Sequence, residues 1–483
     1  MSAPVPSWEE PVDVVVVGFG IAGACAAIAA AETGASVLVV ERASAPGGSA
    51  ALSGGEVYLG GGTATQKECG FEDSADDMFA FLRAALGPHA DEEKLRLYCD
   101  DSADHFRWLV DHGVQFRSSV YADPTWMPPT TDGLMWLGEN SWPFDTVARP
   151  APRGHRPPAP YFAGRLLMDA LVTAADGAGV ATVVDTRATS LIVEDGRVAG
   201  VRARRYGTDH ELRARRGVVL TTGGFVDNEE MLAAHVPALT GHGKVSDGLD
   251  DGSGIRMAQQ AGAATRRMHA HEVALTVVPP LAARGMLVNA HGQRFVNEDT
   301  YPGTVSDAAV AHQPAPYWVI IDEAGFEDVP EPDRWGVRPA HAAETVTELE
   351  VDLGMPAGSL EATVAAYNRY AAHGEDPWFH KAARWLRPLR PPYAAIDVAA
   401  GFSPGGREST ATGTGVSGFT LGGLHTSVDG AVRSVSGDPL PGLWAAGRTT
   451  AGIHGDGYIS GTSLGDGSYF GRRAGRAAAG GGS

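Results

Sequence analysis

Cysteine is scarce in this chain of 483 residues, which contains only Cys25, Cys69 and Cys99. The three lie far apart and form no C-x-x-C pair, so neither a disulfide framework nor a zinc site is expected. Basic residues are also in the minority, because 38 Lys and Arg stand against 58 Asp and Glu, a formal net charge of −20. Nucleic acids and anionic membranes bind basic faces, so the composition predicts neither as a partner.

Signals for export and for membrane insertion are lacking as well. The first ten residues, MSAPVPSWEE, do not combine a basic region with an apolar one as a signal peptide does. Residues 14–31 carry no charge and are long enough to raise the question of a membrane span. Gly18, Gly20 and Gly23 would weaken a continuous helix there, and the preceding valines fit a buried strand better. We therefore expect a cytoplasmic protein with no stable membrane insertion.

The length and the glycine content of the chain allow a large cofactor cleft. A chain of 483 residues is expected to form two domains, because single cores seldom grow past about 300 residues. Its 63 glycines fall at strand ends between apolar runs, which favours loops and cofactor contacts over disorder. Only the tail, residues 477–483, is expected to be frayed.

A dinucleotide-binding fingerprint occupies residues 13–41. Residues 14–17 are predicted to form a buried parallel strand, and Gly18, Gly20 and Gly23 follow in G-x-G-x-x-G spacing before an alanine-rich helix. The first glycine permits a tight turn, the second lets a pyrophosphate approach the backbone, and the third lets the helix close on the strand. The pattern predicts a bound dinucleotide at this turn.

The residues after the fingerprint extend the expected cofactor site. A second strand, residues 36–40, ends in Glu41, where the motif places an acceptor for ribose hydroxyls. A carboxylate there disfavours a 2′-phosphate. The glycine- and serine-rich residues 43–63 are expected to line the pyrophosphate and ring edge of a flavin rather than form a detached loop.

Two segments that follow have contrasting patterns. Residues 75–112 show helical periodicity and are predicted to form packing helices. Residues 121–160 are rich in proline and aromatics, which argues against regular helix and central strand. The large apolar side chains of this segment would either cap the core or roof an apolar ligand, and both interpretations stay open: Tyr121, Trp126, Met127, Met135, Trp136 and Trp142.

From residue 179 the pattern predicts a strand, a β-hairpin about Asp195-Gly196 and a return strand. The return strand ends in a second glycine pair, Gly223-Gly224, a position that approaches the adenosine side of the cofactor in two-dinucleotide folds. Residues 247–262 add a glycine-rich loop that opens another helix, and its N-terminus is a further candidate for facing phosphate.

The chain then leaves the cofactor and returns to it. Residues from about 270 to 392 have no glycine fingerprint and resemble an inserted domain, with strands at 286–289 and 317–321 and a helix near 360–370. The last ninety residues predict a strand, a glycine turn, a long glycine-serine loop and a helix that begins near Ser463.

Taken together, several separated motifs resemble the flavoprotein subunits of the fumarate reductase and succinate dehydrogenase superfamily over nearly the whole chain. Besides the fingerprint they are TTGGF at 221–225, DGSGIRMAQQAGA at 251–263, NAHGQRFVNE at 289–298, LGG at 421–423 and PGLWAAGR at 441–448. The resemblance implies an α/β fold with a two-dinucleotide-binding, Rossmann-like FAD domain in two parts, residues 1–269 and 393–483. Residues 270–392 would form an inserted α+β domain that clamps substrate over the flavin.

The same resemblance implies which residues hold FAD. No histidine stands near residues 49–53, where membrane-bound members link the flavin covalently, so noncovalent FAD is expected. The expected cofactor contacts are Gly18, Gly20, Ile21, Ala22, Gly23, Glu41, Arg42, Gly47, Gly48, Ser49, Ser53, Gly54, Gly55, Gly223, Gly224, Asp251, Gly447, Arg448, Ser463 and Leu464.

The chain departs from the fumarate-reducing members where their substrate residues stand. Those enzymes carry an arginine that acts as an acid just after the FVNE motif, histidines before the LGG-type turn and an arginine in a late N-R-L-G-G stretch. Here the corresponding places read DTYPGT, SGFT and GYISGTS. Without arginines a dicarboxylate has no bidentate partners, so fumarate or succinate chemistry is not expected.

The replacements resemble the 3-ketosteroid dehydrogenases of the superfamily, and Tyr458, Ser460 and Tyr301 most resemble their Δ4-(5α) branch; PAPRGH at 150–155 adds weaker support. This resemblance implies desaturation of a flat apolar ketone at C4–C5, with the 5α hydride passing to flavin N5 and the C4 proton to a Tyr/Ser site. Hydroxyl donors would stabilise the enolate charge. A phenol acts as base only if its neighbours ease deprotonation.

We assign Tyr458, assisted by Ser460, to proton transfer and carbonyl contact, with Tyr301 completing the catalytic site; which hydroxyl is the base stays open. No metal is expected. The four histidines that could suggest a metal site are too widely spaced, and the last of them is a candidate flavin contact instead: His269, His271, His425 and His454.

Other functions stay open at this point. The same residues would serve a desaturase or ene-reductase acting on another bulky apolar ketone, including Δ1 steroid dehydrogenation. A non-catalytic binding protein is a remote alternative, because every cofactor glycine is retained. The electron acceptor is not identified, and a quinone, a dye-like mediator or oxygen would each serve.

Overall fold

The computed structural model describes residues 10–400 and 415–480, and its largest sheet has eight strands. Six follow the order β20-β21-β10-β1-β2-β7, and the pair β8 and β9 extends from β10. Strand β1 is parallel to both neighbours, with Val16 opposite Val39 of β2 and Val219 of β10. These valines are fully buried, as expected where helices cover a parallel sheet. The strands are β1 (Val12–Val17), β2 (Val37–Val40), β7 (Ala181–Val183), β8 (Thr186–Glu194), β9 (Arg197–Arg205), β10 (Thr208–Leu220), β20 (Ala431–Arg433) and β21 (Pro439–Ala445).

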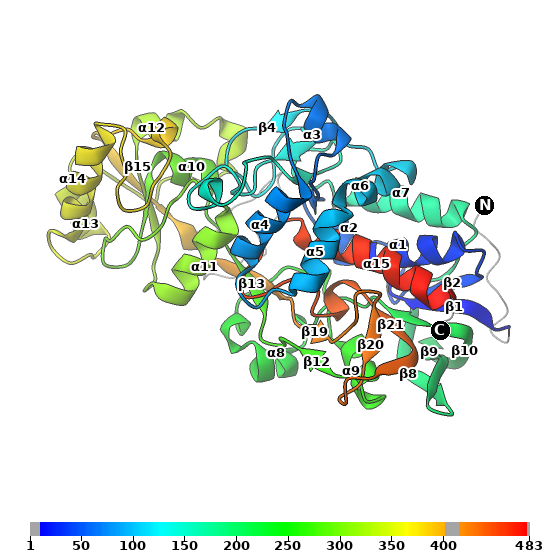
Figure 1. Cartoon of the computed structure of the whole chain (residues 1–483). Helices are drawn as coiled ribbons and strands as arrows, with labels where there is room; N and C mark the ends of the chain where they lie inside the picture. The colour runs from blue at the N-terminus through cyan, green and yellow to red at the C-terminus, as the bar shows by residue number, and fades with distance from the viewer. Residues whose placement is uncertain (1–9, 401–414, 481–483) are drawn as a thin grey trace.

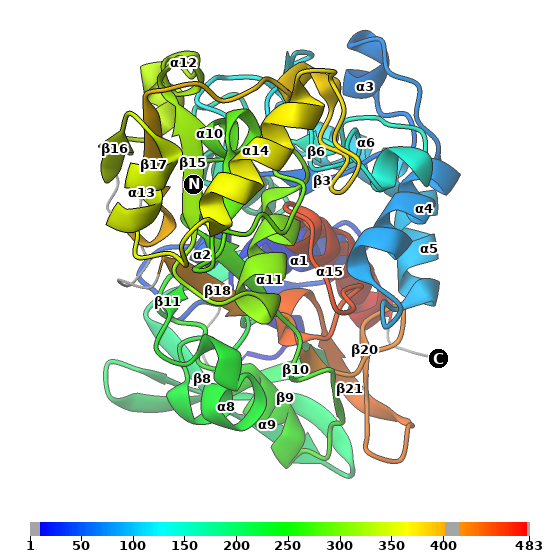
Figure 2. The same ribbon diagram turned by 90° about the vertical axis from the view of Figure 1, so that its left-hand side faces the viewer.

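Two helices rich in small residues pack against each other beside this sheet. They are α1 (Ile21–Ala31), directly after β1, and α15 (Thr462–Gly480), and they lie side by side in both ribbon views (Figures 1 and 2). A Cβ added at Gly475 would lie 2.0 Å from the carbonyl oxygen of Ala26, so the close approach of the helices requires glycine there. The first and last parts of the chain are thereby joined.

The end of α15 differs from the expectation for the tail. The helix continues to Gly480, and Ala478 and Ala479 are buried against the core. The prediction that residues 477–480 are frayed is therefore wrong, because packing of small side chains on α1 stabilises the last helical turns. Residues 481–483 lie outside the described residues, as does the amino-terminal segment 1–9.

The predicted hairpin is confirmed. Strands β8 and β9 are antiparallel and are joined by Asp195 and Gly196, whose φ angles are 48° and 77°. Positive φ at both central residues is the requirement of a type I′ turn, which matches the twist of the two strands. Strand β10 then returns into the parallel sheet and leads to Gly223-Gly224, as expected.

A second lobe contains a four-stranded antiparallel sheet in the order β14-β15-β17-β16, seen at the left of Figure 1. The predicted strands near 286–289 and 317–321 and the predicted helix near 360–370 are all present. Strand β17 begins at Tyr393, so this sheet extends past residue 392. The division into domains at 269 and 392 stays a prediction. The elements are α10 (Pro279–Arg284), β14 (Met286–Val288), α11 (Pro302–His312), β15 (Trp318–Asp322), α12 (Glu323–Glu327), β16 (His341–Ala343), α13 (Val346–Asp352), α14 (Ser359–Ala371) and β17 (Tyr393–Asp397).

Short strands connect the lobe to the cofactor side of the molecule. Strand β13 (His271–Leu275) pairs antiparallel with β18 (Val416–Thr420), and Glu272 stands opposite Phe419. Residues far apart in sequence are thus held on one small sheet. The remaining elements of this region are α8 (Glu229–His235), β11 (Gly243–Lys244), α9 (Ser253–Gln260), β12 (Thr265–Arg266) and β19 (Gly423–Leu424).

Helical periodicity in residues 75–112 correctly predicts packing helices. They are α4 (Ala75–Leu86), α5 (Glu92–Asp100) and α6 (Ser102–Asp111), and several of their apolar residues, among them Phe81 and Leu109, are fully buried. The neighbouring helices are α2 (Gly48–Leu52), α3 (Ala64–Glu68) and α7 (Gly164–Gly177). Across the described residues, no helix combines the length and the apolar character needed to cross a membrane.

The proline- and aromatic-rich segment 121–160 is mostly irregular, but the expectation that it contains no central strand is wrong. It contributes two strands of two residues each to the middle of a four-stranded sheet. Neither strand contains a proline, so both keep the backbone N–H groups that strand pairing needs. The sheet has the order β3-β6-β5-β4, with β3 (Val57–Tyr58), β4 (Val120–Tyr121), β5 (Leu134–Met135) and β6 (Gly154–His155).

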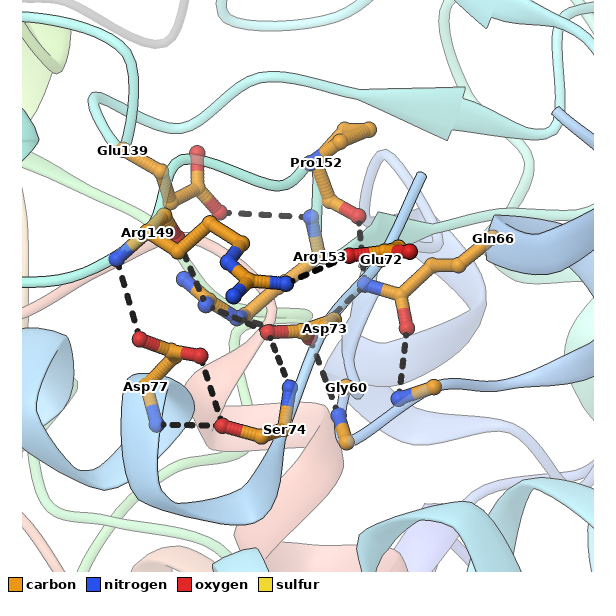
Figure 3. Close-up of polar contacts among 12 residues, drawn as sticks. Gly60, Gln66, Glu72, Asp73, Ser74, Asp77, Glu139, Arg149, Pro152 and Arg153 are labelled. Atoms are coloured by element: carbon orange, nitrogen blue, oxygen red, sulfur yellow. Dashed lines mark hydrogen bonds and ion pairs between the residues drawn. The ribbon is translucent and has the colours of Figure 1, made fainter. Parts of the chain in front are cut away.

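A buried ion pair holds the end of this segment (Figure 3). Arg153 Nη2 lies 2.7 Å from Asp73 Oδ1, and neither side chain has any exposed surface. The Asp73 carboxylate also accepts hydrogen bonds from the Gly61 backbone and from Gln66 Nε2, each of 2.9 Å. Glu139 accepts the backbone N–H of Arg153. The PRG sequence at 152–154 is therefore tied to the glycine-rich loop near the cofactor fingerprint.

Candidate functional site

A cavity of about 500 Å³ opens at the carboxyl ends of β1, β2 and β10. Its walls come from the turn between β1 and α1, the loop after Glu41, the loop after β10, strand β13 and the residues before and at the start of α15. Ligand clefts in open α/β sheets lie at the carboxyl ends of parallel strands, so the position fits the fingerprint.

Two of the three fingerprint glycines, Gly18 and Gly23, occupy the tight turn and the close helix–strand contact predicted from their spacing. Gly18 has a φ of +100°, and a Cβ there would lie 2.5 Å from the carbonyl oxygen of Thr221. A Cβ on Gly23 would lie 1.9 Å from the carbonyl oxygen of Gly18, so α1 can approach β1 only with glycine at this position. Within the described part of the chain, no side chain caps the N-terminus of α1 at Gly20. Its first N–H groups are therefore available to a phosphate.

Charged side chains line the walls beside these glycines. Glu41 is 7% exposed, and its carboxylate oxygens accept the backbone N–H groups of Phe19 and Ala43, each at 2.7 Å. Burial raises the pKa of Glu41. Arg448 Nη2 contacts Asp250 Oδ2 at 2.6 Å, and Arg42 Nη1 contacts Asp251 Oδ2 at 2.7 Å. These pairs fix the side chains that a ribose or pyrophosphate would meet.

Hydroxyl groups gather at the opposite end of the cavity. The Tyr301 hydroxyl lies 3.0 Å from Ser460 Oγ, although the two residues are separated by 159 positions in the chain. Tyr458 lines the same wall, and its ring meets the ring of Phe419 edge-on with centroids 5.1 Å apart. Trp126 packs edge-on against Tyr301 at 6.1 Å. The three predicted catalytic residues therefore share one apolar-walled site.

Both tyrosines at this end favour their protonated form. Burial, and after it the charge of Glu272, raise the pKa of Tyr301 well above its usual value. The same two causes raise the pKa of Tyr458. A phenol in this environment is a hydrogen-bond donor at neutral pH, suited to the oxygen of a carbonyl group.

The structure brings most of the predicted cofactor residues to the cavity wall. Those that line it are Gly18, Gly20, Ile21, Ala22, Glu41, Arg42, Gly48, Ser49, Ser53, Gly54, Gly223, Gly447, Arg448, Ser463 and Leu464. Those that lie behind it are Gly23, Gly47, Gly55, Gly224 and Asp251. The second group supports the first: Gly224, for example, packs closely against Thr420, where a Cβ would lie 2.5 Å from Oγ1.

The N-terminus of α9, the further candidate for facing phosphate, already has one of its backbone N–H groups hydrogen-bonded within the protein. Asp251 Oδ1 accepts the backbone N–H of Ser253 at 3.0 Å, which places a carboxylate at the start of α9. Ser253 and Asp250 line the cavity, whereas Asp251 does not. His454, a candidate flavin contact, is buried behind Tyr458 with Nε2 at 2.9 Å from Thr462 Oγ1, and it is not among the lining residues.

Sequence reasoning missed Glu272 and Phe419 at the hydroxyl end. They are paired across β13 and β18, and both line the cavity. The signal that could have found Glu272 is a lone acid in the apolar strand sequence EVAL, because a charge on a buried strand needs a reason. Segment 121–160 contributes both to the cavity wall and to the core: Trp126 and Met127 line the cavity, while Met135 packs in the core.

The residues present fit FAD. The uncapped helix N-terminus suits a pyrophosphate, and Glu41 stands at the cavity wall where ribose hydroxyls are expected. Fold and site together define a two-dinucleotide-type flavoprotein with an apolar substrate end. The chain belongs to the FAD binding domain family, whose model matches residues 13–464. Its cofactor is FAD.

Individual relatives fall in the steroid and fumarate branches. A crystal structure of 3-ketosteroid-Δ4-(5α)-dehydrogenase from Rhodococcus jostii RHA1 in complex with 4-androstene-3,17-dione is 48% identical, with a TM-score of 0.92 and coverage of 99% of this chain and 100% of that one. A 3-oxosteroid 1-dehydrogenase from Mycolicibacterium smegmatis is 28% identical over 95% of both chains. A probable fumarate reductase, Ifc3, from Shewanella frigidimarina is 29% identical over 98% of this chain and 75% of its own length.

Proposed function

We propose that this chain is an FAD-dependent dehydrogenase that introduces a double bond between C4 and C5 of a 3-ketosteroid. The observation that carries the proposal is the contact of 3.0 Å between the Tyr301 hydroxyl and Ser460 Oγ, beside Tyr458, on the wall of the FAD cavity. The relative of 48% identity is a 3-ketosteroid-Δ4-(5α)-dehydrogenase, which supports the same assignment.

The residues at the hydroxyl end have distinct roles in this proposal. When bound, FAD would supply the acceptor for the hydride. The Tyr458 hydroxyl, kept protonated by burial, donates a hydrogen bond to the ketone oxygen and stabilises enolate charge as the α proton leaves. Ser460, bonded to Tyr301, is placed to receive that proton. Trp126, Met127 and Phe419 supply an apolar surface for a flat ring system.

Fumarate reduction is disfavoured by the pairing of the cavity arginines. Among the described residues, three arginines line the cavity, Arg42, Arg187 and Arg448, and each contacts an aspartate carboxylate. An arginine already paired in this way does not offer a bidentate fork to a dicarboxylate. The hydroxyl end presents tyrosine and serine instead, which suits a neutral ketone.

Anaerobic mixing of the holoenzyme with 5α-androstane-3,17-dione tests the proposal. The flavin absorbance is expected to bleach, and the steroid product is expected to carry a 4-ene by mass spectrometry and NMR. A flavin that stays oxidised with this steroid and with its 5β isomer would refute the steroid assignment while leaving FAD binding intact. A product desaturated at C1–C2 would instead establish the Δ1 alternative, which the relative of 28% identity makes worth testing.

Three further points concern the linkage of FAD, the electron acceptor and the location of the protein. FAD is held without a covalent bond, since no histidine lies between residues 49 and 53, so acid precipitation should release it into the supernatant. The electron acceptor is not identified. The cytoplasmic location expected from the sequence stays a prediction.

A further inference from the structure

Glu272 is a buried acid at the hydroxyl end of the cavity that the proposed mechanism has not yet used. It lies on β13, is 7% exposed and lines the cavity. Its Oε1 atom is buried and has no hydrogen-bond partner anywhere in the described part of the chain. A buried acid without a partner is costly, so the fold retains it against a free-energy penalty.

The Glu272 carboxyl group and the Tyr301 ring both lie next to the backbone of Gly303. A Cβ added at Gly303 would lie 2.6 Å from Glu272 Oε1, 2.2 Å from Tyr301 Cε1 and 2.8 Å from Tyr301 Cζ, the carbon that bears the hydroxyl. Across the strand pair, Phe419 stands opposite Glu272 and packs on Tyr458. Glu272 is therefore enclosed together with both catalytic tyrosines.

The proton removed from the substrate needs an acceptor inside this enclosure. Tyr301 is 1% exposed, and both tyrosines favour the protonated state, so neither is a strong base by itself. A serine hydroxyl such as that of Ser460 can pass a proton on but does not keep it. A carboxylate is the usual group that stores a proton in an apolar site.

We propose that the Glu272 carboxylate is the terminal acceptor of the proton that leaves C4 of the steroid, which reaches it through the Ser460 and Tyr301 hydroxyls. The inference rests on the proposed function. The C4–H bond breaks, its proton passes to Ser460 as the Ser460 proton moves to Tyr301 and the Tyr301 proton moves to Glu272, and the electron pair of that bond forms the new double bond. The hydride from C5 is the pair that FAD accepts. The carboxyl then loses its proton to solvent.

The surroundings of Glu272 define the expected pH dependence. The titratable groups that face it are Tyr301 and Asp307, at and within α11, and Tyr458 in the loop before α15; the residue opposite on β18 is apolar. Burial, and after it the charge of Asp307, raise the pKa of Glu272 well above its usual value. The carboxylate form increases as pH rises, so substrate oxidation should become faster toward alkaline pH.

The test compares three forms of the FAD-loaded protein: wild type, Glu272→Gln and Asp307→Asn. Flavin reduction by 5α-androstane-3,17-dione is followed by stopped flow from pH 5 to 10, with unlabelled and C4-deuterated steroid. Loss of a general base slows a step by about 100-fold or more, so we expect that decrease in Glu272→Gln at alkaline pH. Its rate should no longer rise with pH, and its C4 deuterium isotope effect should increase. The steroid Kd should stay close to the wild-type value.

Asp307→Asn is the matched control, because it removes a neighbouring exposed acid and leaves the carboxyl in place. Its flavin reduction should reach the wild-type maximum, with the alkaline rise shifted to lower pH, since one charge that raises the pKa of Glu272 is gone. A structural role of Glu272 would not produce this opposite behaviour of the two variants.

Infrared difference spectra between wild type and Glu272→Gln, recorded on holoenzyme without steroid, add a readout that does not depend on turnover. A protonated carboxyl band that disappears as pH rises is expected. A wild-type pH profile retained in Glu272→Gln, or a carboxyl that does not titrate, would overturn the inference alone. A wild-type flavin that no 3-ketosteroid bleaches would overturn the proposed function, and with it the substrate named here, while the infrared result would still decide whether Glu272 exchanges a proton.

Discussion

The hydroxyl of Tyr458 shows how a single residue depends on its surroundings. Its ring is fixed between Phe419, edge-on at 5.1 Å, and His454, stacked at 5.5 Å. Burial raises its pKa, so it is suited to donating a hydrogen bond rather than to removing a proton unaided. The same burial that makes the phenol a poor base makes it an effective donor to a developing enolate.

Tyr458→Phe tests this role. The ring contacts remain, so FAD should stay bound with an unchanged visible spectrum, while flavin reduction by steroid should slow by about 100-fold or more through loss of one oxyanion donor. Rapid-mixing absorbance measures both quantities. Tyr469→Phe, which removes a hydroxyl bonded to Asp101 outside the cavity, is the control and should reduce at the wild-type rate. Equal rates for Tyr458→Phe and wild type would remove Tyr458 from the mechanism.

Glu139 provides a pH prediction for stability. Burial raises the pKa of Glu139 to about 7, well above the ordinary value of a glutamate. A raised carboxyl pKa means that the folded state binds the proton more tightly, so stability is highest below the unfolded pKa and is lost as pH rises toward 7. The unfolding free energy of wild type relative to Glu139→Gln should therefore fall by about 3 kcal/mol between pH 4.5 and pH 7 and level off above.

Urea unfolding at several pH values measures this difference. Glu344→Gln, which changes an exposed glutamate, is the control for removing a carboxylate at the surface. A flat difference curve for Glu139→Gln would mean that Arg153 and the backbone donors keep the carboxyl ionised when buried.

At the scale of elements, the strand–turn–helix unit from β1 to α1 determines where the cofactor lies. The close packing of α1 on β1 requires glycine at position 23. Because a Cβ on Gly23 would meet the Gly18 carbonyl oxygen at 1.9 Å, α1 must move away from β1 if the position is filled. The helix N-terminus would then leave the phosphate position.

Gly23→Ala should therefore yield protein with little bound FAD. The flavin-to-protein absorbance ratio after purification is expected to drop at least tenfold, and far-UV circular dichroism should stay close to that of wild type because the helix itself favours alanine. Gly177→Ala, at the end of α7, is the control, since a Cβ there meets nothing within 4 Å. Full FAD occupancy in Gly23→Ala would show that the turn can relax without moving the helix.

At the scale of the whole molecule, FAD is expected to join parts of the chain that are distant in sequence. The cavity walls include the β1–α1 turn, strand β13 near residue 272, Tyr301, and the start of α15. A ligand that binds only the folded state stabilises it by about 2.7 kcal/mol at a concentration of 100 Kd. The cofactor is therefore expected to stabilise both lobes.

Removal of FAD should lower the apparent Tm by several degrees, and added FAD should restore it in a concentration-dependent manner. Differential scanning fluorimetry of the stripped protein, titrated with FAD, measures this. Gly23→Ala should not respond to the same titration. A stripped wild-type protein whose Tm equals that of the holoenzyme would show that the cavity is fully formed and stable without its cofactor.

Much of the fold follows from local pattern. The fingerprint, the hairpin about Asp195-Gly196 and the helices in residues 75–112 were all predictable, because glycine spacing, turn residues and apolar periodicity act over a few neighbouring positions. Two local predictions were wrong. The tail is helical because Gly475 and its neighbours pack on α1, and residues 134–135 and 154–155 form central strands because they pair with each other and with β3.

By itself, the sequence determined that the chain binds a dinucleotide at the end of its first strand, because the G-x-G-x-x-G turn and its acid are contiguous. Only the tertiary structure brought Tyr301 to 3.0 Å from Ser460 across 159 positions, and only it placed beside them the Glu272 Oε1 atom, which has no hydrogen-bond partner within the described residues. The reason is physical: turn geometry is decided by neighbouring residues, whereas the partner and the pKa of a buried side chain depend on groups that folding brings from elsewhere.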